Sequence, residues 1–207
     1  MCGRYYIDAE DKAFQTLIAE IAAGPDGARL LDMNLGEIFP TNTVPALTAG
    51  GPRLMRWGFS RYNGGGAVIN ARSETAMVKP MFAKSLQERR CLLPASCYFE
   101  WQRTRGGAKK QKYAIALPDG KPLYLAGVYR EEKLFPIPVF AILTREAAPK
   151  LAYLHDRMPV LLPSSACDAW ISQTCDVEEI MRNSLTSLIC TAVTAEDKGV
   201  QQELDLK

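Results

Sequence analysis

The sequence has little of what a metal site or a disulfide framework needs. It contains one histidine, His155, and no two of its six cysteines form a CxxC pair. Zinc sites are built from closely spaced Cys and His ligands, and disulfide frameworks occur mainly in exported chains. Residues 1–7 have strand character rather than that of an export signal. We therefore expect no metal, no cofactor and no disulfide framework.

The sequence also lacks an excess of one charge and any long apolar run. Its 25 Lys and Arg face 23 Asp and Glu, so the net charge is +2. The chain is not a globally basic nucleic-acid binder, although a local basic face can still steer phosphate. No apolar run reaches the roughly 20 residues that span a membrane. We expect a cytoplasmic protein that does not associate with membranes and lies on the nucleoid when bound to DNA.

Internal repeats and long Gly/Ser linkers are missing as well. We therefore expect residues 1–207 to form one domain, as a monomer. Asp8 is expected to cap a helix over residues 9–23. Residues 90–101 form one β-like stretch, and residues 118–120, Pro-Asp-Gly, have the signature of a hairpin turn between two further strands. Because strands and helices do not alternate as βαβ units, the fold predicted is α+β, with a mostly antiparallel, barrel-like sheet core and peripheral helices.

The N-terminal Met1-Cys2 pair carries an unusual chemical possibility. If Met1 is removed, Cys2 acquires a free α-amine beside its thiol. This 1,2-aminothiol can condense with an aldehyde to a Schiff base and then close a thiazolidine ring. Alternatively, the amine can act as base for the thiol, as in amide hydrolases with an N-terminal nucleophile. The plain alternative is a cysteine near the start of a strand.

Four polar stretches interrupt otherwise apolar, strand-like sequence: residues 2–4, 70–72, 99–101 and 155–157. Each has an ordinary explanation when taken alone. A glutamate between two aromatic residues can simply face water, a single histidine can be structural, and an asparagine often forms turns. Their joint occurrence is more specific than any one of them.

In combination and in this order, these stretches resemble the SRAP family, named for SOS response-associated peptidases. Its members crosslink themselves to abasic sites in single-stranded DNA. The matching segments are Met1 to Tyr5, Arg56 to Phe59, Ile69 to Thr75, Arg90 to Trp101 and His155 to Pro159. The resemblance implies a partner, single-stranded DNA that contains abasic sites, and a role in the DNA damage response.

The resemblance also implies catalytic roles for Cys2, Asn70, Glu100 and His155. The amine and thiol of Cys2 would attack the aldehyde of the ring-opened sugar. Glu100, which we expect to be partly desolvated by its aromatic neighbours, would transfer protons. By the same resemblance, His155 assists at the Schiff-base stage, and Asn70 holds the amine or the ring by hydrogen bonds, since an amide offers donors and an acceptor without titrating.

The cations beside these residues are candidates for contacts with DNA. Arg4 and Arg72 adjoin the expected reactive residues, where phosphates flanking the sugar would lie. Arg157 is expected either to bind phosphate or to fix the carboxylate of Glu100 or Asp156. The basic loop over residues 103–112 either extends this surface or is simply solvated.

Aromatic and proline residues complete the expected DNA site. Trp57 is expected either to stack on a base or to pack in the core, and Phe59 and Trp101 are weaker candidates for stacking. Pro40 and Asn42 lie on a rigid segment that is expected to wedge or contact the strand at the lesion.

Two other functions share part of this constellation. One is a peptidase or amidohydrolase with Cys2 as N-terminal nucleophile, which would turn over many substrate molecules. The other is a non-catalytic module that binds single strands. The family name implies that the chain itself removes Met1, but a methionine aminopeptidase could also do so because Cys2 is small.

Overall fold

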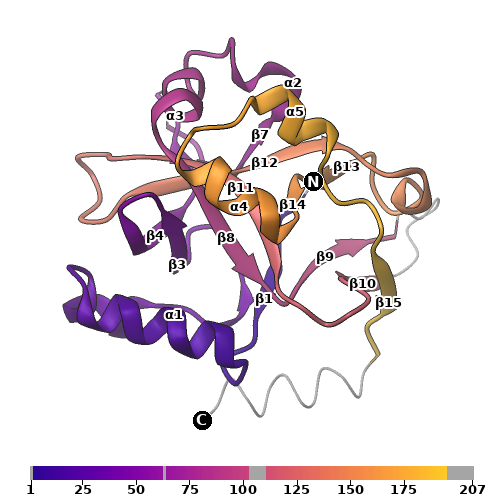
Figure 1. Ribbon diagram of the computed structural model, residues 1–207, viewed down its shortest axis with the longest axis horizontal. Helices are drawn as coiled ribbons and strands as arrows, with labels where there is room; N and C mark the ends of the chain where they lie inside the picture. The colour runs from indigo at the N-terminus through magenta and orange to yellow at the C-terminus, as the bar shows by residue number, and fades with distance from the viewer. Residues whose placement is uncertain (1, 63, 103–110, 195–207) are drawn as a thin grey trace.

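Two β-sheets carry the fold in the computed structural model, which describes residues 2–62, 64–102 and 111–194 (Figure 1). The five-stranded sheet has the order β15-β10-β9-β1-β2, and its neighbouring strands are all antiparallel. In that order, the strands span Ile189–Ala192, Lys112–Ala116, Cys97–Trp101, Tyr5–Ile7 and Gly36–Ile38.

The second sheet closes on itself, and we call it the barrel. β12 pairs with β4, β4 with β3, β3 with β8, β8 with β11, and β11 again with β12. These strands are β3 (Thr43–Thr48), β4 (Gly51–Trp57), β8 (Arg90–Ala95), β11 (Leu123–Arg130) and β12 (Val139–Glu146). Closure removes exposed sheet edges, which is the usual advantage of a barrel. The predicted barrel-like α+β fold is confirmed.

Short strands extend the barrel or lie beside it. β7 (Asn70–Arg72) and β13 (Arg157–Pro159) both pair with β12, and β14 (Leu161–Leu162) pairs with β11. β5 (Phe59–Ser60) and β6 (Ala67–Val68) form a separate two-stranded sheet. β12 therefore holds in place two of the polar stretches singled out by sequence.

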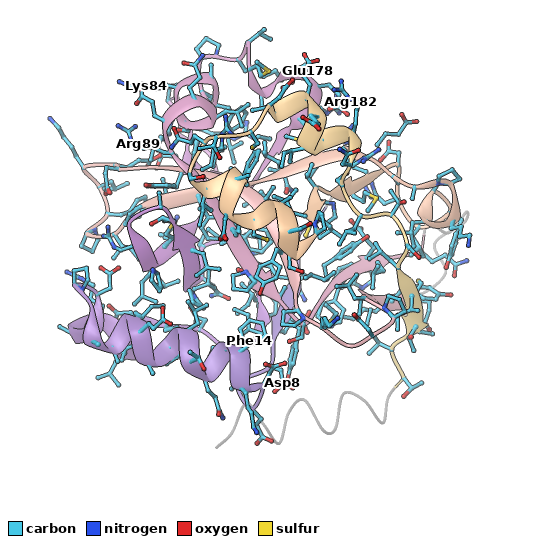
Figure 2. All side chains as sticks on the ribbon, in the orientation of Figure 1. Asp8, Phe14, Lys84, Arg89, Glu178 and Arg182 are labelled. Atoms are coloured by element: carbon cyan, nitrogen blue, oxygen red, sulfur yellow. The ribbon has the colours of Figure 1, made fainter. Side chains whose placement is uncertain are left out.

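Helices cover the outside of the sheets (Figure 1). They are α1 (Lys12–Ala23), α2 (Ser73–Ala76), α3 (Ala83–Glu88), α4 (Ser164–Ile171) and α5 (Val177–Arg182), with 3₁₀ turns η1 (Gly27–Asp32) and η2 (Pro149–Leu151). α1 buries a stripe of apolar residues at helical spacing, and Phe14 on this stripe points towards the sheets in Figure 2. Its N-cap is Asp11, whose carboxylate accepts from Ala13 N–H, so the prediction of Asp8 as the cap is wrong.

The chain passes between the two sheets where sequence predicted continuous structure. Residues 90–101 are two strands rather than one, since β8 lies in the barrel and β9 in the five-stranded sheet. Ser96 makes the crossing, with its N–H donating to Tyr6 O at 2.8 Å. The hairpin predicted around residues 118–120 is also wrong. Its two flanking strands, β10 and β11, belong to different sheets, so this turn is a second crossing.

Gly58 allows two segments to approach closely beside β4. Its φ is +119°, and a Cβ added there would lie 2.5 Å from Ala67 Cβ. Gly51 has a similar φ of +98°, but a Cβ added there meets nothing within 4 Å. An alanine at position 51 would therefore cause backbone strain alone, whereas an alanine at position 58 would cause both strain and steric overlap.

This pair makes a testable prediction. Gly51→Ala is expected to cost roughly 1–2 kcal/mol of unfolding free energy from backbone strain alone. Gly58→Ala is expected to lose the same amount of unfolding free energy from strain and about 1–3 kcal/mol more from overpacking. Urea denaturation of both variants measures the difference, and equal losses would show that Ala67 yields without cost.

Candidate functional site

Cys2 and Asn70 are in direct contact. Asn70 Nδ2 donates to Cys2 O at 2.8 Å, which ties β7 to the residue expected to react. Cys2 is fully buried, and its thiol donates weakly to Arg4 O at 3.9 Å. The side-chain oxygen of Asn70 is buried and accepts no hydrogen bond from the described residues. An acceptor thus remains beside Cys2 that a polar ligand can satisfy.

Glu100 lies close to the same cysteine. It is on β9, and its carboxylate raises the pKa of the Cys2 thiol, although burial is the larger cause of that rise. Glu100 is only 6% exposed. A buried carboxylate near a thiol whose pKa is raised is suited to accept the thiol proton during a reaction.

The two aromatic residues next to Glu100 in sequence lie on the other face of β9. Lys112 Nζ lies over the rings of both Phe99 and Trp101, at 3.7 and 5.9 Å, so these two side chains share one face of the five-stranded sheet. Successive side chains of a strand point to opposite faces, which places Glu100 on the other, inner face. The expected desolvation of Glu100 by Phe99 and Trp101 therefore stays a prediction, and the buried Tyr98, two residues away, lies on the same face as Glu100.

His155 is held by two contacts at its Nδ1. It precedes β13, and Arg157 N–H donates to its Nδ1 at 3.0 Å, while Asp156 Oδ1 lies 2.7 Å from the same nitrogen. One nitrogen cannot accept from the amide and donate to the carboxylate at once, so the two contacts belong to different protonation states of Nδ1. Leu151 and Leu154, just before His155, pack in the core cluster that contains Cys2.

Arg4 lies on the outer face of the five-stranded sheet. Its guanidinium stacks over Phe39 at 3.8 Å and pairs with Glu37 at 2.8 Å. The second oxygen of Glu37 holds Lys112 at 2.7 Å. Sequence analysis missed Glu37, because a carboxylate that bridges two cations from different strands has no local sequence signal. The structure thus separates the Arg4 side chain from Glu100, which faces the other side of the sheet.

The other two expected arginines differ in their surroundings. Arg72 is exposed at the end of β7, directly after the strand that carries Asn70. Arg157 forms a bidentate pair with Glu74 at 2.7 and 2.8 Å and donates to Thr144 O. The hydrogen bond from Arg157 is the largest cause that lowers the pKa of the Glu74 carboxyl group. Arg157 therefore fixes a carboxylate, one of the two roles expected for it, although the partner is neither Glu100 nor Asp156.

Pro40 and Asn42 belong to a tight turn with an unusual backbone. Asn42 Oδ1 accepts from Phe39 N–H at 2.8 Å, and Thr41 between them has a φ of +76°. A β-branched residue in this region is strained, and such strain persists only where the surrounding structure enforces it. Of the basic loop expected over residues 103–112, residues 103–110 lie outside those described.

Trp57 is what holds this turn in place. Its backbone N–H donates to Asn42 O, and its O accepts from Thr41 N–H, each at 2.9 Å. Its indole Nε1 donates to Ile69 O at 3.0 Å, next to Asn70. The ring is fully buried between Tyr5 and Phe140, so it presents no face on which a base could stack. Of the two roles expected for Trp57, the structure shows packing in the core, and Phe59 is buried likewise.

A second prediction tests this role of Trp57. Trp57→Ala is expected to cost about 3–5 kcal/mol of unfolding free energy. Trp57→Phe keeps most of the ring but leaves Ile69 O without its donor, at a cost of about 1–3 kcal/mol. Chemical denaturation checks both values, and a loss below 1 kcal/mol for Trp57→Ala would contradict the proposed packing role.

Tyr5 is a further residue that sequence analysis missed. Its hydroxyl is buried with no hydrogen-bond partner among the described residues, and burial raises its pKa, with a smaller contribution from Cys2. Tyr5 pairs with Tyr98 across β1 and β9, so its ring lies on the inner face that also holds Glu100. Only the three-dimensional register could reveal this, since the tyrosine reads as an ordinary strand residue.

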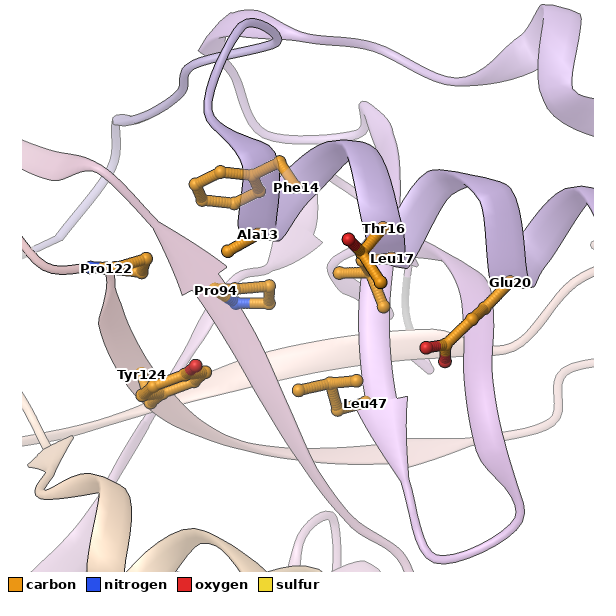
Figure 3. Close-up of a pocket in the computed structure, with 9 residues that line it drawn as sticks. All are labelled: Ala13, Phe14, Thr16, Leu17, Glu20, Leu47, Pro94, Pro122 and Tyr124. Carbon is orange, nitrogen blue, oxygen red and sulfur yellow. The ribbon is translucent and has the colours of Figure 1, made fainter.

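Other candidate sites are limited in the part of the chain that the structure describes. No group of three or more His, Cys, Asp or Glu side chains there is arranged to hold a metal ion. None of its helices has the length and apolar character needed to cross a membrane. The pocket in Figure 3 lies between α1 and the barrel, is lined mainly by apolar residues such as Phe14, Leu17 and Pro94, and contains none of the expected reactive residues.

Fold and site together define an α+β domain in which a closed barrel and a second sheet converge on a cysteine at position 2. The chain belongs to the SRAP family, described as SOS response associated peptidase, whose family model matches residues 1–197.

Its relatives include proteins from bacteria and yeast. The abasic site processing protein YoaM from Bacillus subtilis is 29% identical over 187 residues, covering 83% of this chain and 79% of the relative. YMR114C from Saccharomyces cerevisiae, of the same description, is 30% identical over 146 residues, but the match covers only 38% of that longer protein and 63% of this chain. A crystal structure of a Bacteroides thetaiotaomicron protein shares the fold, with a TM-score of 0.75 at 20% identity over 94% of this chain and 93% of its own.

Proposed function

We propose that this chain, once Met1 is removed, links Cys2 covalently to the aldehyde of an abasic site in single-stranded DNA. The observation that carries the proposal is the contact of Cys2 with Asn70 beside the buried carboxylate of Glu100. Its relatives in Bacillus subtilis and Escherichia coli are described as abasic site processing proteins, which favours an abasic site as the substrate.

The chemistry follows from the groups present. An α-amine has a pKa of about 7.7–8.0, so roughly a tenth to a sixth of it is neutral and nucleophilic at pH 7. The Cys2 amine adds to C1′ of the ring-opened sugar and loses one water to give an imine. The thiol then adds across the C=N bond, its sulfur bonding to carbon and its proton passing to nitrogen. Glu100 accepts the thiol proton and returns it to the nitrogen, while Asn70 fixes the position of Cys2.

His155 is assigned to the first stage of this reaction. Formation of the imine requires protonation of the departing hydroxyl, and an imidazole can supply that proton near neutral pH. The contacts of its Nδ1 with Asp156 and Arg157 N–H offer a stable setting for either protonation state. In this proposal Arg72 binds a phosphate that flanks the lesion, and the turn with Pro40 and Asn42 contacts the strand.

Intact mass spectrometry tests the proposal. The chain lacking Met1 is incubated with a single-stranded oligonucleotide that carries one abasic site. The expected product has the summed mass minus one water, survives heating, and is not reduced by borohydride, since a thiazolidine has no C=N bond. An adduct that gains two hydrogens with borohydride would be an imine, and no adduct at all would refute the proposal.

The family description favours one alternative, a cysteine peptidase or amidohydrolase. It uses Cys2 as N-terminal nucleophile with Asn70 and Glu100, and the same groups could release Met1 from the chain itself. Repeated turnover of an added peptide would support this alternative, whereas a single stoichiometric product supports the crosslink.

A further inference from the structure

A groove of about 330 Å³ lies beside the strained turn and has no role in the chemistry above. Its lining includes Thr41 from the turn, Arg56 and Arg61, a run of three glycines, and Leu134 and Phe135 from the segment between β11 and β12. This volume is at the lower end of the range for sites that hold small ligands. The groove is therefore large enough for about one nucleotide unit.

The groove is positively charged. Its lining contains Arg56 and Arg61 but no aspartate or glutamate. Among the described residues neither arginine forms an ion pair, in contrast to Arg4 and Arg157. Glu132, the nearby acid, is already held by Arg130 at 2.6 Å and by Ser60 N–H at 3.0 Å. An anion entering the groove would meet two arginines whose charge no carboxylate neutralises.

One of these arginines is already oriented. The Arg56 guanidinium lies over the Phe135 ring with its carbon 4.3 Å from the centroid. Such stacking holds the guanidinium plane while its edge donors remain available for an oxygen anion. Leu134, which is 75% exposed, offers apolar surface beside it. The lining thus combines cations with an apolar wall, the combination that suits the phosphate and the base of a nucleotide.

Part of the lining is glycine backbone. Gly64, Gly65 and Gly66 all have φ between +73° and +82°, and a Cβ at any of them would meet nothing within 4 Å. The space beside these glycines is open, so a ligand can approach the main chain closely there. Any other residue at these positions would strain the backbone, and its side chain would narrow the groove.

The groove lies near Cys2 along the chain path. Ala67 lines it and is three residues before Asn70, which spans at most about 11 Å in an extended chain. Asn70 in turn contacts Cys2. Thr41, which also lines the groove, belongs to the turn that Trp57 ties to Ile69, the residue before Asn70.

We infer that this groove binds a phosphodiester group of the DNA strand next to the lesion, with the adjoining nucleotide against Leu134 and Phe135. The inference rests on the proposed function, because it takes the ligand to be the same strand whose abasic site reaches Cys2. It assigns Arg56 and Arg61 as binding residues of the strand.

Salt titration of binding tests this inference. The full chain is titrated with a single-stranded oligonucleotide that has no abasic site, and the logarithm of affinity is plotted against that of salt concentration. Each phosphate contact on a single strand contributes about 0.7 to the slope. Arg56→Gln and Arg61→Gln are each expected to lower the slope by about that amount. Arg182→Gln, on α5 and outside the groove lining, removes the same charge and is expected to leave it unchanged.

Three outcomes overturn the inference. Equal slopes for all three variants would mean that no phosphate contacts these arginines. Competition by inorganic phosphate at the same concentration of phosphate groups would show an isolated anion site instead of a strand site. Slower reaction of the groove variants with free 2-deoxyribose, an aldehyde without phosphate, would show that they disturb the reactive centre. Arg61 is exposed, so its variant stays informative even if Arg56→Gln destabilises the fold.

This design separates the groove from the covalent chemistry. Wild-type protein that binds intact DNA with the expected slope but forms no adduct with abasic DNA would refute the proposed function alone. Normal adduct formation together with unchanged slopes in both groove variants would refute the groove alone.

Discussion

Replacing Cys2 with alanine is expected to abolish the heat-stable adduct with abasic DNA. The alanine chain keeps the α-amine once Met1 is removed, so it still forms an imine with the sugar aldehyde. Without a thiol the imine cannot close to a ring and reverts with water. Borohydride should therefore trap an adduct of Cys2→Ala that heating without borohydride destroys.

Cys97→Ala is the matched control for this prediction. Cys97 is also a free thiol of the five-stranded sheet, but it lies on the face that holds Glu37 and Lys112. Its loss should leave both the yield and the heat stability of the adduct unchanged. Heat-stable adduct of undiminished yield from Cys2→Ala would exclude the thiazolidine.

Glu100→Gln is expected to slow adduct formation by a factor of about 10²–10⁴, the usual contribution of a general acid or base. The direction of the effect discriminates between two roles. The Glu100 carboxylate raises the pKa of the Cys2 thiol, so neutralising it lowers that pKa and makes the thiolate easier to form. If Glu100 acted only through its charge, the variant would therefore react faster. A slower reaction despite a more acidic thiol indicates proton transfer.

The pH dependence of the single-turnover rate measures both effects. For Glu100→Gln, we expect a lower rate across the profile and a thiol ionisation shifted to lower pH. Glu37→Gln is the control, since it removes a carboxylate from the opposite face of the same sheet. A Glu100→Gln rate equal to that of wild type would remove Glu100 from the mechanism.

Sequence predicted the fold class because strand patterns and the order of motifs are local properties. It could not predict which strands pair. The turn at residues 118–120 is present, but β10 pairs with β9 and β15, so the chain leaves the sheet at the turn instead of folding back. Residues 90–101 likewise looked continuous, although Ser96 divides them between two sheets. Pairing is decided by tertiary packing, which alternation along a single segment does not encode.

The candidate site, too, could be predicted from sequence only in part. Motifs identify Cys2, Asn70 and Glu100, and the hydrogen bond from Asn70 to Cys2 and the electrostatic effect of Glu100 on the Cys2 thiol agree with that grouping. The aromatic residues were harder to interpret. A tryptophan such as Trp57 can stack on a base when its ring is exposed. Its exposure depends on Tyr5 and Phe140, which are remote in sequence. The bridging role of Glu37 and the groove at Arg56 also arise only when distant strands meet.

The crossings at Ser96 and at residues 118–120 have a consequence for how the reactive centre can fail. Cys2 leads into β1 and Glu100 lies on β9, both strands of the five-stranded sheet, whereas Asn70 lies on β7 and His155 precedes β13, which both pair with β12 of the barrel. The relative positions of these four residues thus depend on the packing of the two sheets against each other. We expect a partial opening between the two sheets to separate the groups of the proposed reaction while both sheets stay intact, at a free-energy cost below that of global unfolding.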